Sequence, residues 1–415
     1  MDDSADRQDV SAPNAGPKND AGRAISHVPA LDGVRGIAIL LVVTLHFGVA
    51  ADFPNRSGIT ATRWLERLFY TGWSGVDLFF VLSGFLITSI LVASRSEAHY
   101  FRRFYGRRVL RIFPLYYAAL VLGLILIPSL LPQRTPQLLE DAVAGQAWLW
   151  TYSLNFAMVF GRIGGAGVLG HFWTLAIEEQ YYIFWPWIVK TLSNRAMLLT
   201  CGVLVIGALL LRIVWMALGL GWEGAYRFTL TRVDAFGTGA LIAFLVRTPR
   251  WRKRLVAFGP YGLVAGFLVI GAIFLAVPHF YPSEWVVVTF GHSVLAAMFG
   301  CLVLIGLRDP APRWLSGDAL SALGRYSYGL YVWHWPLQRM LLAWYAARPI
   351  QARPSAGLLD ALTFLVTGMV GSALLGWASY QLLEQPFLRL KRYFAYGSGR
   401  EPWKAAERLP ATPVS

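Results

Sequence analysis

Long apolar runs separated by short polar loops are the main pattern of this chain. The runs cover roughly residues 31–50, 72–93, 109–131, 143–160, 171–190, 197–219, 231–246, 255–277, 285–307, 320–345 and 357–383. Because about 20 apolar residues in a helix cross the hydrocarbon core of a bilayer, each run is a candidate membrane-spanning helix. The pattern predicts an all-helical, polytopic membrane bundle.

Two arginine-rich loops decide how many runs cross. They contain Arg95, Arg102, Arg103, Arg107, Arg108 and Arg111 before the third run, and Arg247, Arg250, Arg252, Lys253 and Arg254 after the seventh. Basic loops of this kind stay on the cytoplasmic side, so an even number of crossings must separate them. The run 143–160 is short and holds Gln, Thr, Ser and Asn. We therefore expect ten crossings, with 143–160 as an outward-facing or re-entrant segment and both chain ends cytoplasmic.

Composition supports a membrane protein. The chain has 415 residues, of which 56% are hydrophobic and 14% are charged, and its mean hydropathy is +0.49. The net charge of +14 does not indicate nucleic acid, because the basic residues lie in short loops that face anionic lipid. Cys201 and Cys301 sit in apolar runs and predict neither a disulfide framework nor a metal site. We expect a disordered cytoplasmic tail over 1–28, a transmembrane domain over 29–387 and a basic cytoplasmic tail over 388–415.

Three ionisable residues stand out in the first run, which is otherwise apolar. Asp32, Arg35 and His46 all lie within it. A charge inside hydrocarbon costs roughly 2.5 to 3.5 kcal/mol, so such residues are functional candidates. Arg35 and His46 are eleven positions apart, which is about 16 Å along a helix. They should lie near opposite faces of the membrane.

Other polar residues of the apolar runs fall into two groups, one near each face of the membrane. His46, Asp77 and Glu178 all fall in the outer third of the membrane, and a histidine beside carboxylates is typical of an oriented general base. Arg108 and Arg111 lie one helical turn apart at the cytoplasmic face, where arginine forks can bind phosphate. This arrangement indicates a phosphorylated donor that enters from the cytosol. Acetyl-coenzyme A fits, because its pantetheine arm can span the gap.

Each candidate also has a structural interpretation. His46 can cap or snorkel at a helix end, and much of the arginine-rich loop can serve as a membrane anchor. His334 in YSYGLYVWHWP can be a buried core histidine or a substrate ligand. Glu178 and Glu179 are adjacent, about 100° apart on a helix, so we expect only one of them to face the bundle core.

Several motifs resemble one known family. From Leu31 to Phe387 they are LDGVRGIAILLVVTLHF, GVDLFFVLSGFLIT, RRVLRIFPLYY, FWTLAIEEQYYIFWP, RVDAFGTGALIA, YSYGLYVWHWP and SYQLLEQPF. In this order they resemble the membrane-bound acyltransferase-3 family, which are integral-membrane O-acyltransferases that act on carbohydrates. The resemblance implies transfer of an acyl group, usually acetyl from acetyl-CoA, across the bacterial cytoplasmic membrane. The implied acceptor is a hydroxyl of a carbohydrate such as lipopolysaccharide O-antigen or exopolysaccharide.

The resemblance also implies roles for individual residues. The arginine–histidine pair of the family falls on Arg35 and His46, its RxxR on Arg108 and Arg111, and its glutamate on Glu178. We expect His46 to be the general base, with Glu178 or Asp77 orienting it, and an acyl-histidine intermediate as the alternative. Arg35, Arg108 and Arg111 would hold the phosphates of acyl-CoA, a co-substrate rather than a tightly bound cofactor. The residues expected at the acceptor are Trp173, Arg232, Asp234, Tyr331 and His334.

Other functions fit part of this pattern. A secondary transporter could use buried His and Glu side chains as a proton relay, but the sequence has no repeat symmetry and its arginines cluster at one face. An acyltransferase could act on a small molecule such as a macrolide. A scaffold for polysaccharide export would not need His46.

Overall fold

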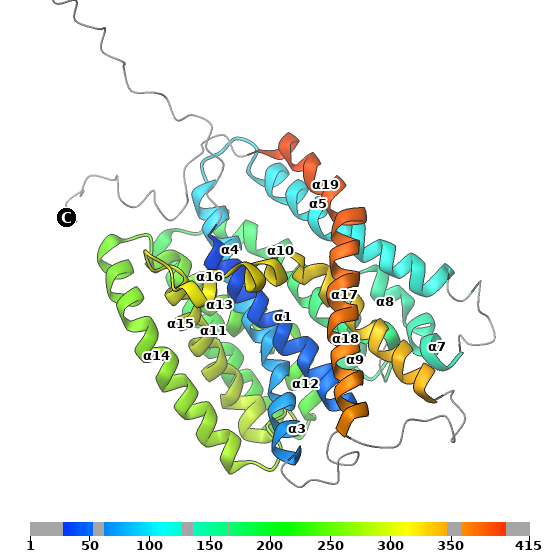
Figure 1. The fold of residues 1–415 in the computed structure, drawn as a ribbon. Helices are drawn as coiled ribbons and strands as arrows, with labels where there is room; N and C mark the ends of the chain where they lie inside the picture. Colours follow the sequence, from blue (N-terminus) through cyan, green and yellow to red (C-terminus); the bar gives the residue numbers. More distant parts are fainter. Residues whose placement is uncertain are drawn as a thin grey trace, which may run out of the picture.

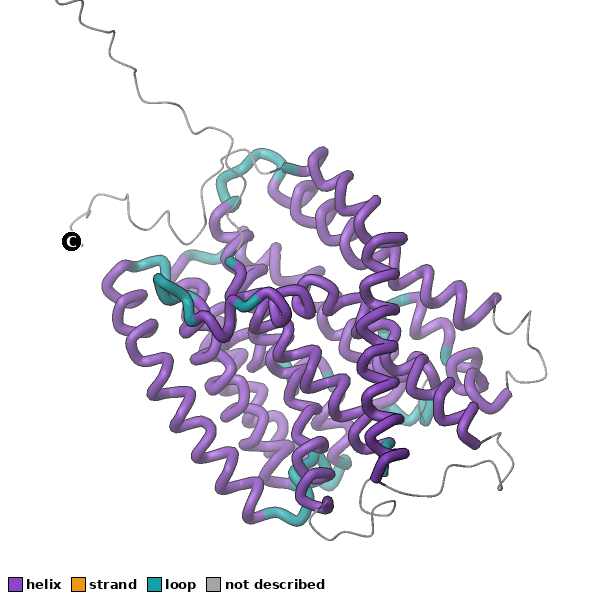
Figure 2. The backbone as a smooth tube through the Cα atoms, in the orientation of Figure 1, coloured by secondary structure: helices purple, strands orange, loops and turns teal. Residues whose placement is uncertain are grey.

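The described part of the chain is a bundle of helices. The computed structural model describes residues 28–52, 62–126, 129, 136–164, 167–346 and 358–395. These residues form helices joined by short loops, and no strand occurs among them (Figure 2). The long helices stand side by side, with α14 (Pro249–Ala276) along one flank of the bundle (Figure 1). The expected all-helical polytopic fold is confirmed.

Each run expected to cross the membrane coincides with a helix. In chain order these are α1 (Pro29–Ala50), α4 (Gly75–Ala93), α5 (Tyr100–Val121), α10 (Trp173–Thr191), α11 (Asn194–Ala217), α13 (Val233–Leu245), α14, α15 (His292–Gly306), α17 (Asp318–Ala346) and α18 (Leu358–Ser379). Among the described residues, 7 helical stretches are long and apolar enough to span a membrane, and α13 is apolar but shorter. The chain is therefore a multi-pass membrane protein, and the number of ten crossings stays a prediction.

The run 143–160 forms no long helix. It is divided among α7 (Pro136–Ala144), α8 (Gln146–Trp150) and α9 (Leu154–Val159), of which the longest has 9 residues. A helix needs about 20 residues to cross, so this geometry agrees with a segment that does not span the membrane.

Shorter elements complete the fold. They are α3 (Thr62–Tyr70), η1 (Thr71–Ser74), η2 (Leu122–Leu126), η3 (Gly167–Phe172), α12 (Trp222–Arg227), η4 (Thr229–Thr231), η5 (Val287–Gly291), α16 (Arg313–Ser316), η7 (Tyr380–Glu384), α19 (Gln385–Arg389) and η8 (Leu390–Phe394).

Contacts between loops support the expected order of crossings. Arg95, just after α4, donates hydrogen bonds to the main-chain oxygens of Lys190, in the last turn of α10, and Leu192, just after that helix. The Lys190 ammonium donates in return to the main-chain oxygen of Arg95 at 2.6 Å. The two loops therefore lie at the same end of the bundle. This result is expected if α5 and α10 both cross and the segment between them does not.

The helices α1 and α17 pack backbone against backbone. A Cβ atom on Gly36 would lie 2.2 Å from the main-chain oxygen of Leu320, and one on Gly324 would lie 1.8 Å from that of Asp32. Only glycine permits such an approach, and small residues are typical of helix contacts in membranes. This packing fixes the polar side chains of α1 relative to those of α17.

Candidate functional site

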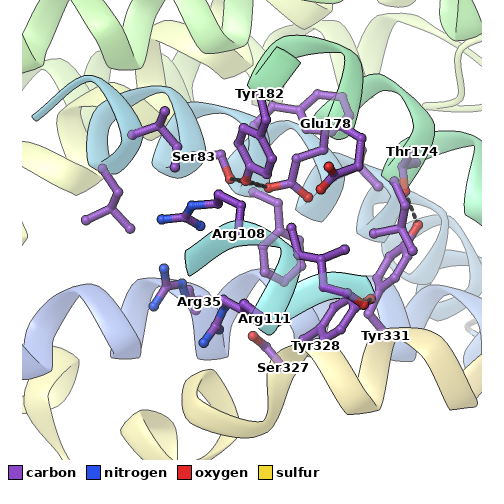
Figure 3. Close-up of a pocket in the computed structure, with 18 residues that line it drawn as sticks. Arg35, Ser83, Arg108, Arg111, Thr174, Glu178, Tyr182, Ser327, Tyr328 and Tyr331 are labelled. Carbon is purple, nitrogen blue, oxygen red and sulfur yellow. Dashed lines mark hydrogen bonds between the residues drawn. The ribbon is translucent and has the colours of Figure 1, made fainter. Parts of the chain in front are cut away.

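Two cavities formed by described residues contain most of the expected site residues. The arginine cavity, of about 90 Å³, is lined by Arg35, Val76, Phe79, Phe80, Ser83, Leu86, Ile87, Arg108, Arg111, Ile112, Thr174, Leu175, Glu178, Glu179, Tyr182, Ser327, Tyr328 and Tyr331 (Figure 3). The histidine cavity, of about 370 Å³, is lined by Val42, Leu45, His46, Trp73, Val76, Asp141, Met158, Gly164, Gly167, Gly170, His171, Trp173, Thr174, Tyr226, Arg227, Tyr281, Tyr331, Trp335 and Arg339.

Three arginines from two helices converge on the arginine cavity (Figure 3). Arg35 on α1 forms an ion pair of 3.1 Å with Asp32, one turn earlier. The guanidinium of Arg108 on α5 lies over the ring of Tyr182, 5.4 Å from its centroid, and Arg111 follows one turn later. Within the described part of the chain, neither Arg108 nor Arg111 pairs with a carboxylate. Their unpaired forks can bind an anionic group such as a phosphate.

Both neighbouring glutamates of α10 line this cavity. Glu178 accepts hydrogen bonds from the hydroxyls of Ser83, at 2.5 Å, and of Tyr182. Glu179 is buried, and its Oε1 has no hydrogen-bond partner among the described residues. The expectation that only one of the two would face the core is wrong, because the cavity borders adjacent flanks of α10.

His46 lines the histidine cavity and is held from two helices. Its Nδ1 lies 2.9 Å from the main-chain oxygen of Val42 and 3.2 Å from Nε2 of His334 on α17. Its ring meets that of Trp335 edge-on, with 4.4 Å between the ring centroids. The side chain of Gln338 donates to the main-chain oxygen of His46 at 2.6 Å. These contacts leave the ring little freedom to turn.

Neither carboxylate expected to orient His46 contacts it. Asp77 pairs with Arg232 at 2.9 Å and lies 3.1 Å from Nδ1 of His292. Glu178 faces the arginine cavity instead. The expectation rested on equal depth in the membrane, and depth does not determine which neighbour a side chain faces across the bundle. The structure thus shows no contact that supports an orienting role for Asp77 or Glu178.

Arg232 and Asp234 belong to the same buried network as Asp77. Arg212 on α11 pairs with Asp234 on α13 at 2.6 Å, and the side chains of Arg212 and Arg232 are 0% exposed. The network joins α4, α11, α13 and α15, and none of these charged residues lines either cavity. The structure therefore places Arg232 and Asp234 in the core, where they pair with side chains of neighbouring helices and do not line the histidine cavity.

The other expected acceptor residues lie at the histidine cavity. Trp173 and Tyr331 line this cavity. His334 does not line it but contacts His46, which does. Sequence reasoning did not assign Ser83, Glu179, Tyr182, His171, Arg227, Trp335 and Arg339 to a site. A signal existed for Tyr182, which follows Glu178 by four residues and so shares its helix face. No group of His, Cys, Asp and Glu side chains within the described ranges is arranged to hold a metal ion.

The two cavities meet inside the bundle. Val76, Thr174 and Tyr331 line both of them. The hydroxyl oxygens of Thr174 and Tyr331 lie 2.5 Å apart, and Tyr331 donates a hydrogen bond of 3.0 Å to the main-chain oxygen of His171. The hydrogen-bonded pair Thr174 and Tyr331, with Val76, thus lies between a basic cavity and a histidine-bearing cavity.

The helical bundle and its two adjoining cavities define a multi-pass membrane protein with a polar site between its helices. A family model described as "Acyltransferase domain" matches residues 28–380. The chain belongs to this family, the acyltransferase-3 family, as its motifs indicated.

Several curated bacterial proteins are similar to the chain. The peptidoglycan O-acetyltransferase OatA of Listeria monocytogenes is 29% identical over 331 residues, which are 75% of this chain and 49% of that protein. The O-acetyltransferase OatA of Staphylococcus aureus is 26% identical over 89% of this chain and 58% of its own length. The putative peptidoglycan O-acetyltransferase YrhL of Bacillus subtilis is 26% identical over 87% and 55%. The chain thus spans about half the length of these relatives. No solved structure matches it.

Proposed function

We propose that the protein transfers an acetyl group from acetyl-CoA to a hydroxyl of a cell-envelope carbohydrate on the other side of the membrane. The observation that carries this proposal is the meeting of the arginine cavity and the histidine cavity at Thr174 and Tyr331. A donor bound by its phosphates in the first cavity can present its acyl end to the second. Membership of the acyltransferase-3 family supports this function over a transporter or a scaffold.

The arginine cavity is the proposed donor site. Coenzyme A carries a diphosphate and a separate phosphate, and guanidinium forks bind such groups through paired hydrogen bonds. Arg108 and Arg111 have no carboxylate partner in the described chain, so they are available for phosphate, and Arg35 lines the same space. The pantetheine arm would extend from these arginines past Glu178 toward Thr174 and Tyr331.

The histidine cavity is the proposed site of chemistry. His46 takes the proton of the acceptor hydroxyl, and the oxygen attacks the thioester carbonyl carbon. The new C–O bond forms, the C–S bond breaks, and the thiolate leaves and accepts the proton that the imidazolium gives up. The alternative is an acyl-histidine intermediate, in which His46 itself receives the acetyl group before the acceptor does.

The acceptor is proposed from the walls of the histidine cavity and from the relatives. Trp173, Tyr226 and Trp335 offer aromatic surfaces, and Arg227 and Arg339 offer hydrogen-bond donors, as a polar carbohydrate requires. The names of two relatives include peptidoglycan. Peptidoglycan is therefore the first acceptor to test, followed by lipopolysaccharide O-antigen and exopolysaccharide.

The proposed orientation in the membrane can be tested with single cysteines. In a variant in which Cys201 and Cys301 are replaced by alanine, cysteines are placed at the exposed positions Ser96, Thr248 and Ser283. A membrane-impermeant maleimide should label the first two only from the cytoplasmic side and the third only from outside. Labelling of Ser96→Cys or Thr248→Cys from outside would overturn the ten-crossing arrangement.

The activity can be tested in inside-out membrane vesicles. Radiolabelled acetyl-CoA is added to the cytoplasmic face, and label is measured in the carbohydrate trapped in the lumen. We expect label with the wild type and none above background with His46→Ala at an equal membrane level. Equal labelling by both proteins, or accumulation of intact acetyl-CoA in the lumen, would contradict the proposal, and the second result would favour a transporter.

A further inference from the structure

His334 on α17 contacts the ring of His46. His334 is itself buried, so it cannot contact substrate. Its side chain is 0% exposed, and it lines neither cavity. Its Nδ1 lies 2.7 Å from the main-chain oxygen of Tyr331 and 3.2 Å from that of Leu330. Because a carbonyl oxygen can only accept, Nδ1 of His334 carries the hydrogen. In the neutral ring, Nε2 of His334 is then an acceptor.

The hydrogen on His46 follows from this assignment. Nδ1 of His46 lies 2.9 Å from the main-chain oxygen of Val42 and 3.2 Å from Nε2 of His334. Both neighbours are acceptors, so Nδ1 of His46 is the donor, and its Nε2 has a free lone pair. This Nε2 makes no hydrogen bond within the described residues and is not among their buried unpartnered atoms, so it is open to the histidine cavity.

We propose that His334 is a positioning residue, which holds His46 in the tautomer whose Nε2 can take the proton of the acceptor. This inference rests on the proposed function, in which His46 is the general base. When Nε2 of His46 gains a proton, its Nδ1–H belongs to a cation. The hydrogen bond to His334 then becomes charge-assisted, which makes it about twice as strong as a neutral one. His334 thereby stabilises the imidazolium that the reaction forms.

The surroundings of His334 keep its ring in place. Pro336 has no N–H, so the main-chain oxygen of Val332 lacks its usual helical partner. Nε2 of His171 lies 3.2 Å from this oxygen and can donate to it. The ring of His171 then packs against that of His334, with 5.1 Å between the centroids. His334 is thus fixed between His46 on one side and His171 on the other.

Three substitutions separate this role from packing. The amide of His334→Gln can place an oxygen near the position of Nε2 and accept from His46. The shorter amide of His334→Asn can donate to the carbonyl of Tyr331 and does not reach His46. His334→Leu does neither. A matched control is Ser321→Ala, which removes another partly buried hydrogen bond between α17 and α1, from Ser321 to the main-chain oxygen of Pro29.

The variants are compared by kcat and by the KM for acetyl-CoA, at equal amounts of folded protein. Loss of a hydrogen bond to a charged group lowers a rate by about 10- to 150-fold. We expect a fall of this size in kcat for His334→Asn and His334→Leu, a fall of less than about threefold for His334→Gln, and an unchanged KM for acetyl-CoA in all three. Ser321→Ala should match the wild type.

The same assay with His46→Ala separates the two hypotheses. If His46→Ala keeps wild-type transfer, the proposed function itself fails. If His46→Ala is inactive while His334→Asn and His334→Leu stay within threefold of the wild type, only the positioning role fails. Equal losses in His334→Gln and His334→Leu would also overturn it, because packing alone would explain them.

Discussion

The hydroxyl oxygens of Thr174 and Tyr331 lie 2.5 Å apart at the point where the arginine cavity meets the histidine cavity. If the acetyl group passes from one cavity to the other, it must pass this pair. The Tyr331 ring then limits the size of the acyl group that can reach His46. The ring, rather than its hydroxyl, should determine which chain length is accepted.

Substitutions at Tyr331 test this limit on chain length. Tyr331→Ala should raise the ratio of butyryl-CoA turnover to acetyl-CoA turnover by several-fold, because it widens the passage. Tyr331→Phe is the matched control, because it removes the hydrogen bonds and keeps the ring, so its ratio should stay at the wild-type value. Purified protein with each donor and a fixed acceptor gives the comparison. An unchanged ratio in Tyr331→Ala would place the acyl route elsewhere.

Substitution of the arginines that line the arginine cavity should weaken binding of the donor. Each charge-assisted hydrogen bond is worth about 1.5 to 3 kcal/mol, so Arg108→Ala with Arg111→Ala should raise the KM for acetyl-CoA by more than tenfold. Arg111→Lys should bind acetyl-CoA better than Arg111→Ala but less well than the wild type, because an ammonium lacks the planar fork. Arg102→Ala is the control, since Arg102 is an exposed arginine of the same helix that lines neither cavity. A double variant with the wild-type KM would remove phosphate binding from this cavity.

The helices could be predicted from the sequence because their signals are local. Hydropathy located each long helix. The basic loops required one run that does not cross, and the short length and polar residues of 143–160 identified it as that run. The donor cavity was partly predictable, since Arg108 and Arg111 are one turn apart and Arg35 lies at the same depth.

The partners of His46 could not be predicted in the same way. His46 and His334 are 288 positions apart, and their contact depends on how glycines let α1 approach α17. The sequence predicted the same depth for Asp77, Glu178 and His46, but Asp77 and Glu178 each face another neighbour. Sequence position gives depth in a membrane bundle, whereas the direction of a side chain across the bundle depends on helix packing.

Substitutions in the buried network around Asp77 should lower the stability of the protein rather than its turnover. Removing one partner of a buried ion pair costs about 3 to 5 kcal/mol, because it leaves the other charge uncompensated. Asp77→Asn should therefore lower the melting temperature and the yield of detergent-solubilised protein, and Asp234→Asn should do the same. The turnover of each folded molecule should stay within a few-fold of the wild type. A fully stable but inactive Asp77→Asn protein would indicate that Asp77 is a catalytic residue, as the sequence suggested.

The proposed chemistry depends on His46. If it is the general base, His46→Ala should insert normally while transfer falls by about two to four orders of magnitude. The KM for acetyl-CoA should change little, because the arginines line a different cavity from His46. His46→Gln keeps similar volume and hydrogen bonding but cannot accept a proton at neutral pH, so it should be as inactive as His46→Ala.

The His46 variants also separate direct transfer from an acyl-histidine intermediate. Both routes predict inactive variants, but only the intermediate predicts label on wild-type protein incubated with radioactive acetyl-CoA and no acceptor, and no such label on His46→Gln. Direct transfer predicts no protein-bound label on either, because the C–S bond breaks only when the acceptor oxygen attacks. Glycan acetylation by His46→Gln at the wild-type membrane level is the decisive measurement. Transfer within a few-fold of the wild type would remove His46 from the mechanism and leave it as a packing residue between α1 and α17.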